Sequence, residues 1–380
     1  MSKSFHMIDT QKALREVVAR LGDEPCIALD TEFVWDRTYY ARLGLIQVGL
    51  ASGVSYLIDP VSIADLTPLG DILSASRITK ILHDAPQDLM LLKRATGASA
   101  TGVFDTRLAA GFAGLSSVLS LANLVAELLD VHLPKEHTRV NWMVRPFRQE
   151  YLDYAVDDVL HLPEVAEIIR QRARAAGSEA WLSEELATLN DPDRYDEKPA
   201  NEAYLRLRAS ASLPPRNLAV LRELAAWREE RARTADKPRR WLMEDGELVS
   251  VAAKLPQSGD ALCRCKKLQR QSAQRYGKDL LAAVERGLAL PEEALPPPVF
   301  RPSRDAKHRR PVDAALEQIV TRAQSRQIDP QIVCSKGDLA MVLQGGIPTG
   351  RTDHPLLCGW RAELLGDTLT GREPELNLGV

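Results

Sequence analysis

Cys26-Ile27-Ala28-Leu29-Asp30-Thr31-Glu32-Phe33 is the stretch that decides the fold. Its apolar beginning has the length of a short buried strand, and two carboxylates follow one residue apart. Because residues i and i+2 of a strand point to the same face, Asp30 and Glu32 should converge at the edge of a hydrophobic core. Two anions held this close repel each other unless a cation, usually a hard divalent one, lies between them. Alone the triplet is a weak signal, because acids at a strand end are commonly just solvated.

Composition and charge limit what the chain can be. Its 380 residues exceed one ordinary core and predict two or three domains. The net charge of −3 means that any nucleic-acid binding must use local basic patches. The five cysteines are odd in number and scattered, which argues against a disulfide framework and predicts a reducing compartment. No segment reads as a signal peptide or a membrane span, so we expect a cytoplasmic protein that does not bind a membrane.

The first half of the chain alternates strand-like and helix-like segments. Runs at 43–50 and 54–58 follow the first strand through short connections, which predicts an antiparallel meander. Apolar runs at 78–82 and 103–104 predict two further strands, and the patterns at 86–94 and 107–174 are helical. We therefore predict an α/β domain with a mixed sheet over residues 1–195.

The second half changes character after a polar boundary at 190–199, which contains two prolines. Only helical patterns follow it. We predict a small helical domain at 205–288, a proline-rich and basic linker at 289–311, and a second helical domain at 312–375. The two helical blocks have comparable length and order of elements, which is typical of a duplicated module.

A third acid lies where it could join the pair on the first strand. The strand at 78–82 runs into His83-Asp84-Ala85-Pro86-Gln87-Asp88. Pro86 suits the first turn of a helix, so Asp88 should face inward near the carboxyl end of a strand. Asp84 is an alternative acid at this place.

A later helix carries a tyrosine and a fourth acid on one face. Tyr154 and Asp158 are four residues apart and adjoin an apolar stripe. An acid beside such a stripe needs a counter-charge. Asp157 is the alternative ligand, but it lies about 300° round the helix from Tyr154, which favours Asp158.

Together these motifs resemble the DEDDy exonucleases and, among them, the ribonuclease D family. Asn141 stands where that family often has an acid. The resemblance covers essentially the whole chain and implies a ribonuclease H-like mixed-sheet exonuclease domain followed by two small all-α HRDC-like domains. The stretches that carry it are Leu29-Asp30-Thr31-Glu32-Phe33, His83-Asp84-Ala85-Pro86-Gln87-Asp88, Phe104-Asp105-Thr106, Asn141-Trp142-Met143-Val144-Arg145-Pro146 and Tyr154-Ala155-Val156-Asp157-Asp158-Val159.

The resemblance implies a catalytic set of five residues and two divalent cations. The cations would be Mg²⁺ or Mn²⁺, and a tyrosine that is neutral at pH 7 would orient the attacking water. The reaction would be hydrolysis of RNA from the 3′ end with release of nucleoside 5′-monophosphates. The implied metal ligands are Asp30, Glu32, Asp88 and Asp158, and the implied tyrosine is Tyr154.

Three further residues are candidates for contacts with the substrate, each with a structural alternative. Phe33 could stack on the terminal base or belong to the core. His83 could contact the substrate or form hydrogen bonds at the strand end. Arg145 could reach a phosphate or form a surface salt bridge.

The expected partner is RNA with a single-stranded 3′ end, such as a tRNA precursor, in tRNA 3′ processing and stable RNA maturation. We expect a monomer and no nucleotide cofactor. The alternatives are a DNA-directed 3′→5′ exonuclease and a non-catalytic RNA-binding module, and the presence of all four carboxylates with the tyrosine disfavours the second.

Contacts with the RNA backbone could come from three basic clusters. They are Arg228, Arg231, Arg233, Lys237, Arg239 and Arg240; Arg264, Lys266, Lys267, Arg270, Arg275 and Lys278 around Tyr276; and Arg301, Arg304, Lys307, His308, Arg309 and Arg310.

Overall fold

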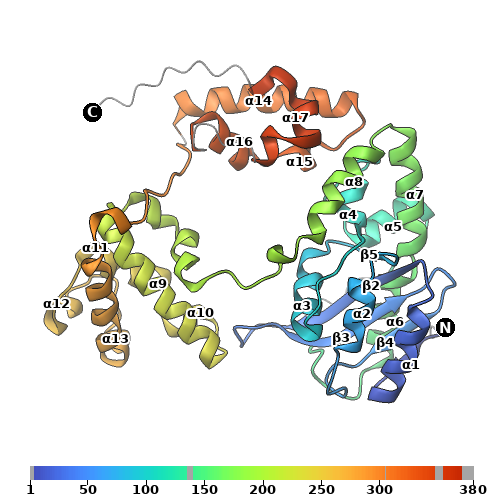
Figure 1. The fold of residues 1–380 in the computed structure, drawn as a ribbon, viewed down its shortest axis with the longest axis horizontal. Helices are drawn as coiled ribbons and strands as arrows, with labels where there is room; N and C mark the ends of the chain where they lie inside the picture. The colour runs from blue at the N-terminus through green and yellow to red at the C-terminus, as the bar shows by residue number, and fades with distance from the viewer. Residues whose placement is uncertain (1–3, 135–139, 304, 347–353, 370–380) are drawn as a thin grey trace. The chain divides into compact units, whose positions relative to one another are not determined.

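The computed structural model describes residues 4–134, 140–303, 305–346 and 354–369 (Figure 1). Contacts divide the chain into two compact units. Unit 1 combines the chain up to Val34, Leu43–Asp196 and the chain from Pro302 onward. Unit 2 combines Trp35–Arg42 with Glu197–Arg301.

Unit 1 is built on a mixed six-stranded sheet, which confirms the predicted fold class. Its strand order is β1-β4-β3-β2-β5-β6. β3 and β4 pair antiparallel, whereas β1 with β4, β2 with β5, and β5 with β6 pair parallel. The edge strand β1 was not predicted, because three residues are too few for a visible alternation. The strands are β1 (His6–Ile8), β2 (Cys26–Val34), β3 (Arg42–Gly49), β4 (Ser55–Ile58), β5 (Thr79–Leu82) and β6 (Val103–Asp105).

The central strand β2 brings the acids to the rim of the core. Its apolar residues Ile27, Ala28 and Leu29 are buried, and Ala28 pairs with Ile81 of β5. β2 and β5 run parallel, so their carboxyl ends meet at the same edge of the sheet. The acids of β2 therefore lie beside the turn that leads from β5 into helix α3.

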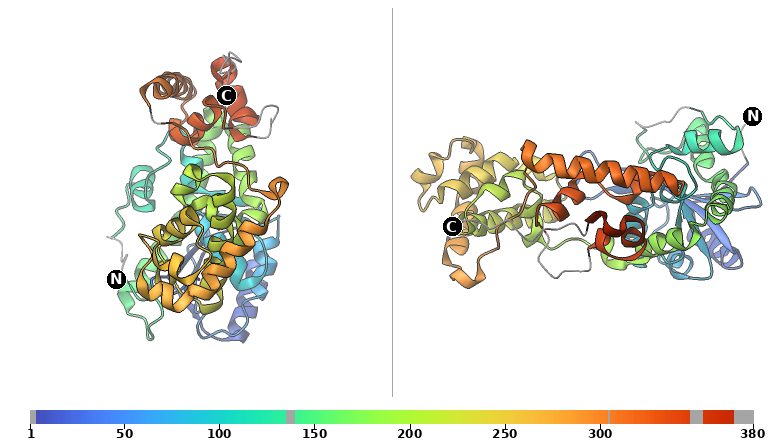
Figure 2. Two further views of the ribbon diagram at one scale, coloured as in Figure 1. Left: turned by 90° about the vertical axis from the view of Figure 1, so that its left-hand side faces the viewer. Right: turned by 90° about the horizontal axis from the view of Figure 1, so that it is seen from above.

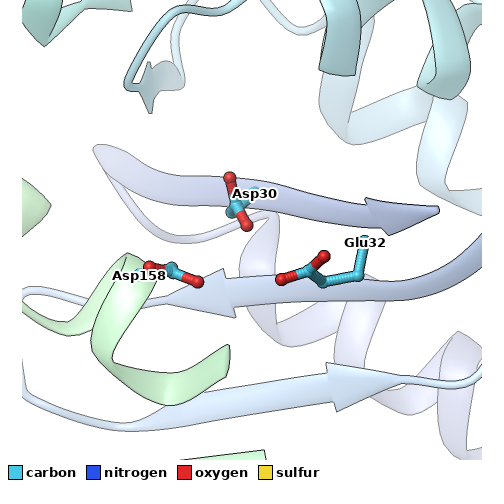
Figure 3. A group of neighbouring side chains, drawn as sticks. All are labelled: Asp30, Glu32 and Asp158. Atoms are coloured by element: carbon cyan, nitrogen blue, oxygen red, sulfur yellow. The ribbon is translucent and has the colours of Figure 1, made fainter. Parts of the chain in front are cut away.

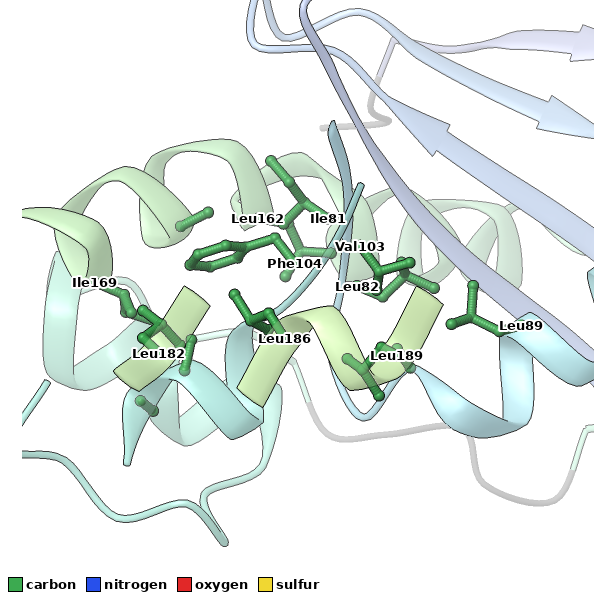
Figure 4. Packing of buried hydrophobic residues seen from close by; sticks show 14 of the residues in the cluster. Ile81, Leu82, Leu89, Val103, Phe104, Leu162, Ile169, Leu182, Leu186 and Leu189 are labelled. Carbon is green, nitrogen blue, oxygen red and sulfur yellow. The ribbon is translucent and has the colours of Figure 1, made fainter. Parts of the chain in front are cut away.

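Helices of unit 1 surround this sheet. The interior in Figure 4 joins sheet residues such as Ile81 and Phe104 to Leu162 and Ile169 of α7 and to Leu182 of α8. The helices before residue 190 are α1 (Gln11–Leu21), α2 (Pro68–Ser74), α3 (Pro86–Thr96), α4 (Thr106–Ala110), α5 (Leu121–Leu129), α6 (Gln149–Leu160), α7 (Leu162–Ala175) and α8 (Glu179–Ala187).

Helix α6 packs closely against the sheet at a glycine of β3. A Cβ on Gly49 of β3 would lie 2.7 Å from the carbonyl oxygen of Val159 in α6, so only glycine permits this approach. A separate apolar cluster of Leu45, Leu57 and Val156 fills the space beside it. The helix that carries Asp158 is thus held at a fixed height above the strands.

The C-terminal helices of unit 1 share its hydrophobic core. Phe112 meets Trp360 with ring centroids 5.0 Å apart, and Arg361 forms an ion pair with Glu185 of α8. These helices form one group, coloured orange to red in Figures 1 and 2. Residues 347–353 and 370–375 of the predicted second helical domain lie outside the described residues. The group consists of α14 (Ala306–Ser325), α15 (Pro330–Val333), α16 (Lys336–Leu343) and α17 (Gly359–Leu365).

Unit 2 is a helical bundle with its own core. Leu218, Leu221 and Leu224 of α9 pack with Leu280 and Val284 of α13. Its helices are α9 (Pro215–Ala235), α10 (Arg239–Leu242), α11 (Asp245–Lys254), α12 (Gly259–Cys263) and α13 (Arg270–Ala289). Short 3₁₀ turns of the two units are η1 (Thr188–Asn190), η2 (Pro192–Arg194), η3 (Ala200–Arg206), η4 (Arg208–Ser212), η5 (Glu292–Ala294), η6 (Pro355–Leu357) and η7 (Gly366–Leu369).

The connection between β2 and β3 belongs to this bundle rather than to the sheet. The backbone N–H groups of Tyr39 and Tyr40 donate to Asp236, the C-cap residue of α9.

Over the described residues, every helix is too short or too polar to cross a membrane.

Candidate active site

A cavity of about 520 Å³ opens in unit 1 at the carboxyl ends of β2 and β5. Its lining brings together all five residues of the predicted catalytic set and two of the three predicted substrate contacts. These lining residues are Asp30, Glu32, Asp88, Tyr154 and Asp158, with Phe33 and His83.

Three of the carboxylates form a tight group within this cavity. One oxygen each from Asp30, Glu32 and Asp158 lies within 4.8 Å of the other two. Figure 3 shows Asp158 entering from α6, while the other two come from β2. A donor set of carboxylate oxygens alone fits a hard cation such as Mg²⁺ or Mn²⁺.

Burial and mutual repulsion disfavour the charged form of these carboxyl groups unless a cation lies beside them. Burial, together with Asp158 and Asp88, raises the pKa of Glu32 to about 9. Burial and the neighbouring carboxylates also raise the pKa of Asp30 well above its usual range. Without a cation, Glu32 therefore retains its proton at neutral pH. A divalent cation removes this penalty, and the residues present fit such an ion.

Asp88 reaches the same cavity from the first turn of α3. The Thr31 hydroxyl donates a hydrogen bond to its Oδ1, so the residue between the two acids of β2 orients the third acid. Burial raises the pKa of Asp88 to about 7. Asp88 lies outside the tight group of three, although it raises the pKa of both Asp30 and Glu32.

The sequence left two positions ambiguous, and the structure separates the candidates. Asp84 is largely exposed and forms an ion pair with Arg107, whereas Asp88 is buried. Asp157 and Asp158 both line the cavity, but among the described residues only Asp158 joins the tight group. Geometry thus favours Asp88 and Asp158 as ligands.

His83 lines the cavity with both ring nitrogens engaged by the protein. Its Nε2 lies 3.1 Å from the carbonyl oxygen of Leu119, which can only accept, so Nε2 carries the proton. Nδ1 lies 3.0 Å from the Thr106 hydroxyl. Burial lowers the pKa of His83, which favours the neutral ring. These contacts favour the strand-end alternative over a contact with the substrate.

Arg145 lies outside the lining of this cavity. Its Nε and Nη2 donate to both oxygens of Asp59, at 2.9 and 2.6 Å, and Nη2 also donates to the carbonyl oxygen of Gly44. Asp59 is buried, so the pair fixes the loop before α6 against β3 and β4. The structure therefore favours the salt-bridge alternative for Arg145, although the partner is buried.

The sequence shows Asp105 only within the stretch Phe104-Asp105-Thr106, without a role of its own, and the structure shows that it positions the site. Its buried carboxylate accepts from the backbone N–H groups of Asp84 and Ala85, and also from that of Arg107. It holds the turn between β5 and α3 that delivers Asp88. The available signal was an aspartate immediately before a helix, which is typical of an N-cap.

The basic clusters differ in how accessible their members are. In the first cluster, Arg228 is buried and donates to the carbonyl oxygen of Met243, so the expectation that it contacts RNA is wrong. Arg239 is largely occupied by an ion pair with the buried Glu229. The basic members of the second cluster are exposed, whereas Tyr276 is buried. In the third cluster, Arg304 lies outside the described residues.

Comparison with known proteins assigns the chain to a family. Residues 5–174 match a 3′–5′ exonuclease family model, and residues 217–284 match the HRDC domain. Ribonuclease D of Desulfotalea psychrophila is 37% identical over 366 residues, covering 96% of this chain and 97% of the relative. Ribonuclease D of Granulibacter bethesdensis is 33% identical, covering 98% and 94%.

A solved structure agrees with these matches. The crystal structure of Escherichia coli RNase D, described as an exoribonuclease involved in structured RNA processing, superposes with a TM-score of 0.86. It is 30% identical and covers 97% of this chain and 98% of that chain. The similarity includes the sheet, the carboxylate-bearing elements and the helices that follow. The chain therefore belongs to the ribonuclease D family, with a 3′–5′ exonuclease domain and an HRDC domain.

Proposed function

We propose that the protein is a 3′→5′ exoribonuclease that releases nucleoside 5′-monophosphates. The observation that carries the proposal is the half-buried group of Asp30, Glu32 and Asp158 in one cavity with Asp88 and Tyr154. The family assignment and the similarity to an exoribonuclease that processes structured RNA support it. The substrate class is RNA with a single-stranded 3′ end, with tRNA precursors as the candidate targets.

The four carboxylates would hold two divalent cations, Mg²⁺ or Mn²⁺. When bound, such ions activate a water and stabilise the charge that develops on the scissile phosphate and the leaving 3′ oxygen. Asp30, Glu32 and Asp158 supply the compact part of the donor set, and Asp88 completes it. Asp88 is buried and the other three are half-buried, and the reduced access of water strengthens each electrostatic contact with the substrate.

Two side chains of the cavity would position the substrate and the water. Tyr154 lies one helical turn before Asp158 on α6, so its hydroxyl shares the face of a metal ligand. A neutral tyrosine hydroxyl can donate to or accept from the attacking water and hold it in line. Phe33 lines the same cavity one residue after Glu32 and is placed to stack on the terminal base.

The proposal extends to the organisation and setting of the enzyme. We propose an exonuclease domain at residues 1–195, a first HRDC-like domain at 205–288, a linker and a second HRDC-like domain at 312–375. The linker expected at 289–311 is shorter at its end, because α14 begins at Ala306. We further propose that the enzyme acts as a monomer in the cytoplasm and needs no nucleotide cofactor. The five free thiols agree with a reducing compartment.

A time course on matched substrates tests the proposal. Single-stranded RNA and DNA oligonucleotides of one sequence, labelled at either end, are incubated with Mg²⁺, with Mn²⁺ or with EDTA. We expect 5′-labelled RNA to shorten progressively and 3′-labelled RNA to release a labelled mononucleotide at once, only with metal. Asp158→Asn is the inactive control. Faster digestion of DNA would favour the DNA-directed alternative, and hydrolysis in EDTA would contradict the metal assignment.

A further inference from the structure

A second cavity, of about 410 Å³, lies entirely within unit 2. Segment Trp35–Arg42 forms one side, and residues of η3, α9 and α10 form the other. Two tryptophans lie in its wall, Trp35 at 60% exposure and Trp241 at 59%. Large aromatic rings that remain exposed on one cavity are typical of a surface that binds something.

Two carboxylates of this cavity, those of Glu229 and Asp245, are already paired with arginines. Glu229 is buried and accepts from Arg239, whose Nη2 lies 2.7 Å from its Oε1. The Tyr39 hydroxyl also donates to this carboxylate, at 2.5 Å. At the side of the cavity, Arg228 pairs with Asp245 at 2.8 Å. The hydrogen bond from Tyr39, with those from the backbone N–H groups of Tyr39 and Tyr40 to Asp236, fixes segment Trp35–Arg42 on the bundle.

Cations remain at the rim after this pairing. Arg206 is half exposed and only approaches the shared Glu229, at 3.8 Å. Arg240 is exposed and, among the described residues, forms no ion pair with a carboxylate. The Lys237 ammonium lies 5.8 Å above the Trp241 ring. Asp36 and Asp245 are exposed acids of this lining; Arg37 pairs with Asp36 at 3.5 Å and Arg228 with Asp245 at 2.8 Å.

We infer that this cavity binds single-stranded RNA, with bases stacked on Trp35 and Trp241 and phosphates contacted by Arg206 and Arg240. Exposed aromatic faces next to exposed cations suit nucleotides, because every base has a π-face and every phosphodiester link carries a negative charge. The inference rests on the proposed function for its choice of RNA. It does not depend on the catalytic chemistry.

RNA binding by the full-length chain tests this inference. In an inactive Asp158→Asn background, Trp35→Ala and Trp241→Ala should each raise the Kd for a single-stranded RNA about tenfold. Replacement by Phe should restore most of the affinity. Leu205→Ala, which removes another exposed apolar side chain of unit 2 outside the cavity, is the control.

Salt dependence separates the phosphate contacts from stacking. Arg206→Gln and Arg240→Gln should each reduce the slope of log Kd against log salt by about one. An RNA affinity of both tryptophan variants equal to that of the Leu205 control would overturn the inference. If the tryptophan variants lose affinity and the protein with Asp158 intact hydrolyses no RNA, the result would support this site while refuting the proposed function.

A different set of contacts links the C-terminal helices to the catalytic cavity. Asp329, the N-cap of α15, accepts from the backbone N–H of Ser117 at 2.6 Å and from its hydroxyl at 2.8 Å. The next three residues, 118–120, form part of the cavity wall. Arg107 donates to the Ser117 carbonyl oxygen at 3.1 Å, and His83 holds the carbonyl oxygen of Leu119.

We propose that Asp329 is a positioning residue for the catalytic cavity. It fixes one end of the wall segment, while Arg107 and His83 fix the remainder from the sheet side. The contact is supported by tight packing nearby, since a Cβ on Gly111 would lie 2.7 Å from Cγ2 of Ile332 in α15. The C-terminal helices thus act on catalysis through the wall as well as through any contact with RNA.

Hydrolysis of a dinucleotide tests the role of Asp329, because so short a substrate minimises the contacts that RNA can make outside the catalytic cavity. Asp329→Ala should lower kcat about tenfold and increase hydrogen exchange at the amide of Ser117. Asp313→Asn, which changes a half-exposed acid of α14 that pairs with Lys336, is the control. Unchanged kcat in Asp329→Ala with increased exchange at Ser117 would overturn the proposal. Asp329→Asn can still accept one hydrogen bond and should therefore keep more of the wild-type kcat than Asp329→Ala. Equal losses of kcat in the two variants would also overturn the proposal.

Discussion

Replacing Glu32 with glutamine should inactivate the enzyme and yet stabilise its metal-free form. The carboxyl of Glu32 has a pKa of about 9 in the fold against 4.5 ordinarily, because burial and two neighbouring carboxylates disfavour its charge. The folded protein must therefore take up a proton that the unfolded chain releases above pH 4.5. A glutamine has nearly the same shape and needs no proton.

The size of this effect follows from the two pKa values. At pH 7, about 2.5 pH units above the ordinary pKa, the wild type loses about 3 kcal/mol of folding free energy at this residue. The stability contribution of Glu32 is fully present below pH 4.5 and is lost as the pH rises towards 9. Glu32→Gln should therefore exceed the wild type by about 3 kcal/mol at pH 7 and by less than about 1 kcal/mol at pH 5.

Urea unfolding in EDTA at several pH values measures this difference. Glu16→Gln, which changes an exposed glutamate on α1, is the matched control and should leave the free energy of unfolding nearly unchanged. Adding Mg²⁺ or Mn²⁺ should raise the Tm of the wild type and have much less effect on Glu32→Gln. A Glu32→Gln protein that is less stable than the wild type in EDTA at pH 7 would refute the argument that the acids repel one another.

The remaining predictions concern the ligands, the scaffold and pH. Asp158→Asn should abolish hydrolysis measured as mononucleotide release, while its Kd for RNA stays within about twofold of the wild-type Kd. Turnover at the wild-type rate would refute the role of Asp158 as a metal ligand. Arg145→Ala should lower the free energy of unfolding by about 3 kcal/mol, because it leaves Asp59 buried without its partner, but should not change the Kd for RNA in an inactive background. Gly49→Ala should cost about 1–3 kcal/mol and reduce kcat, because its Cβ would collide with Val159 and displace α6; unfolding and steady-state kinetics together check this. The rise in Tm caused by Mg²⁺ should grow between pH 6 and pH 9, since the protons retained by the site must leave before a cation binds, and a pH-independent rise would contradict the raised pKa values.

Local chain geometry made much of the catalytic cavity predictable. The two-residue period of a strand places Asp30 and Glu32 on one face, and the four-residue spacing on a helix aligns Tyr154 with Asp158. These relations need only the secondary structure, which the apolar patterns indicated correctly for β2, β5 and α6. The order of the motifs then indicated the family, which the comparisons confirm.

The partners of charged side chains could not be predicted in the same way. Arg145 and Arg228 look like surface arginines in the sequence, but tertiary contacts bury their partner or the arginine itself. The role of Asp105 likewise depends on its contacts with the backbone of Asp84 and Ala85, which lie 21 and 20 residues earlier in the chain. Each of these pairings joins elements that only the fold brings together.

The sequence alone therefore determined the identity of the reactive carboxylates and the kind of element that carries each one. Tertiary structure decided how strongly those acids repel, because burial and distances between elements set their pKa values. It also placed Trp35–Arg42 with the helical bundle and the C-terminal helices with the catalytic core. The physical reason is that spacing along a strand or helix is a local property, whereas burial and pairing are sums over residues far apart in the chain.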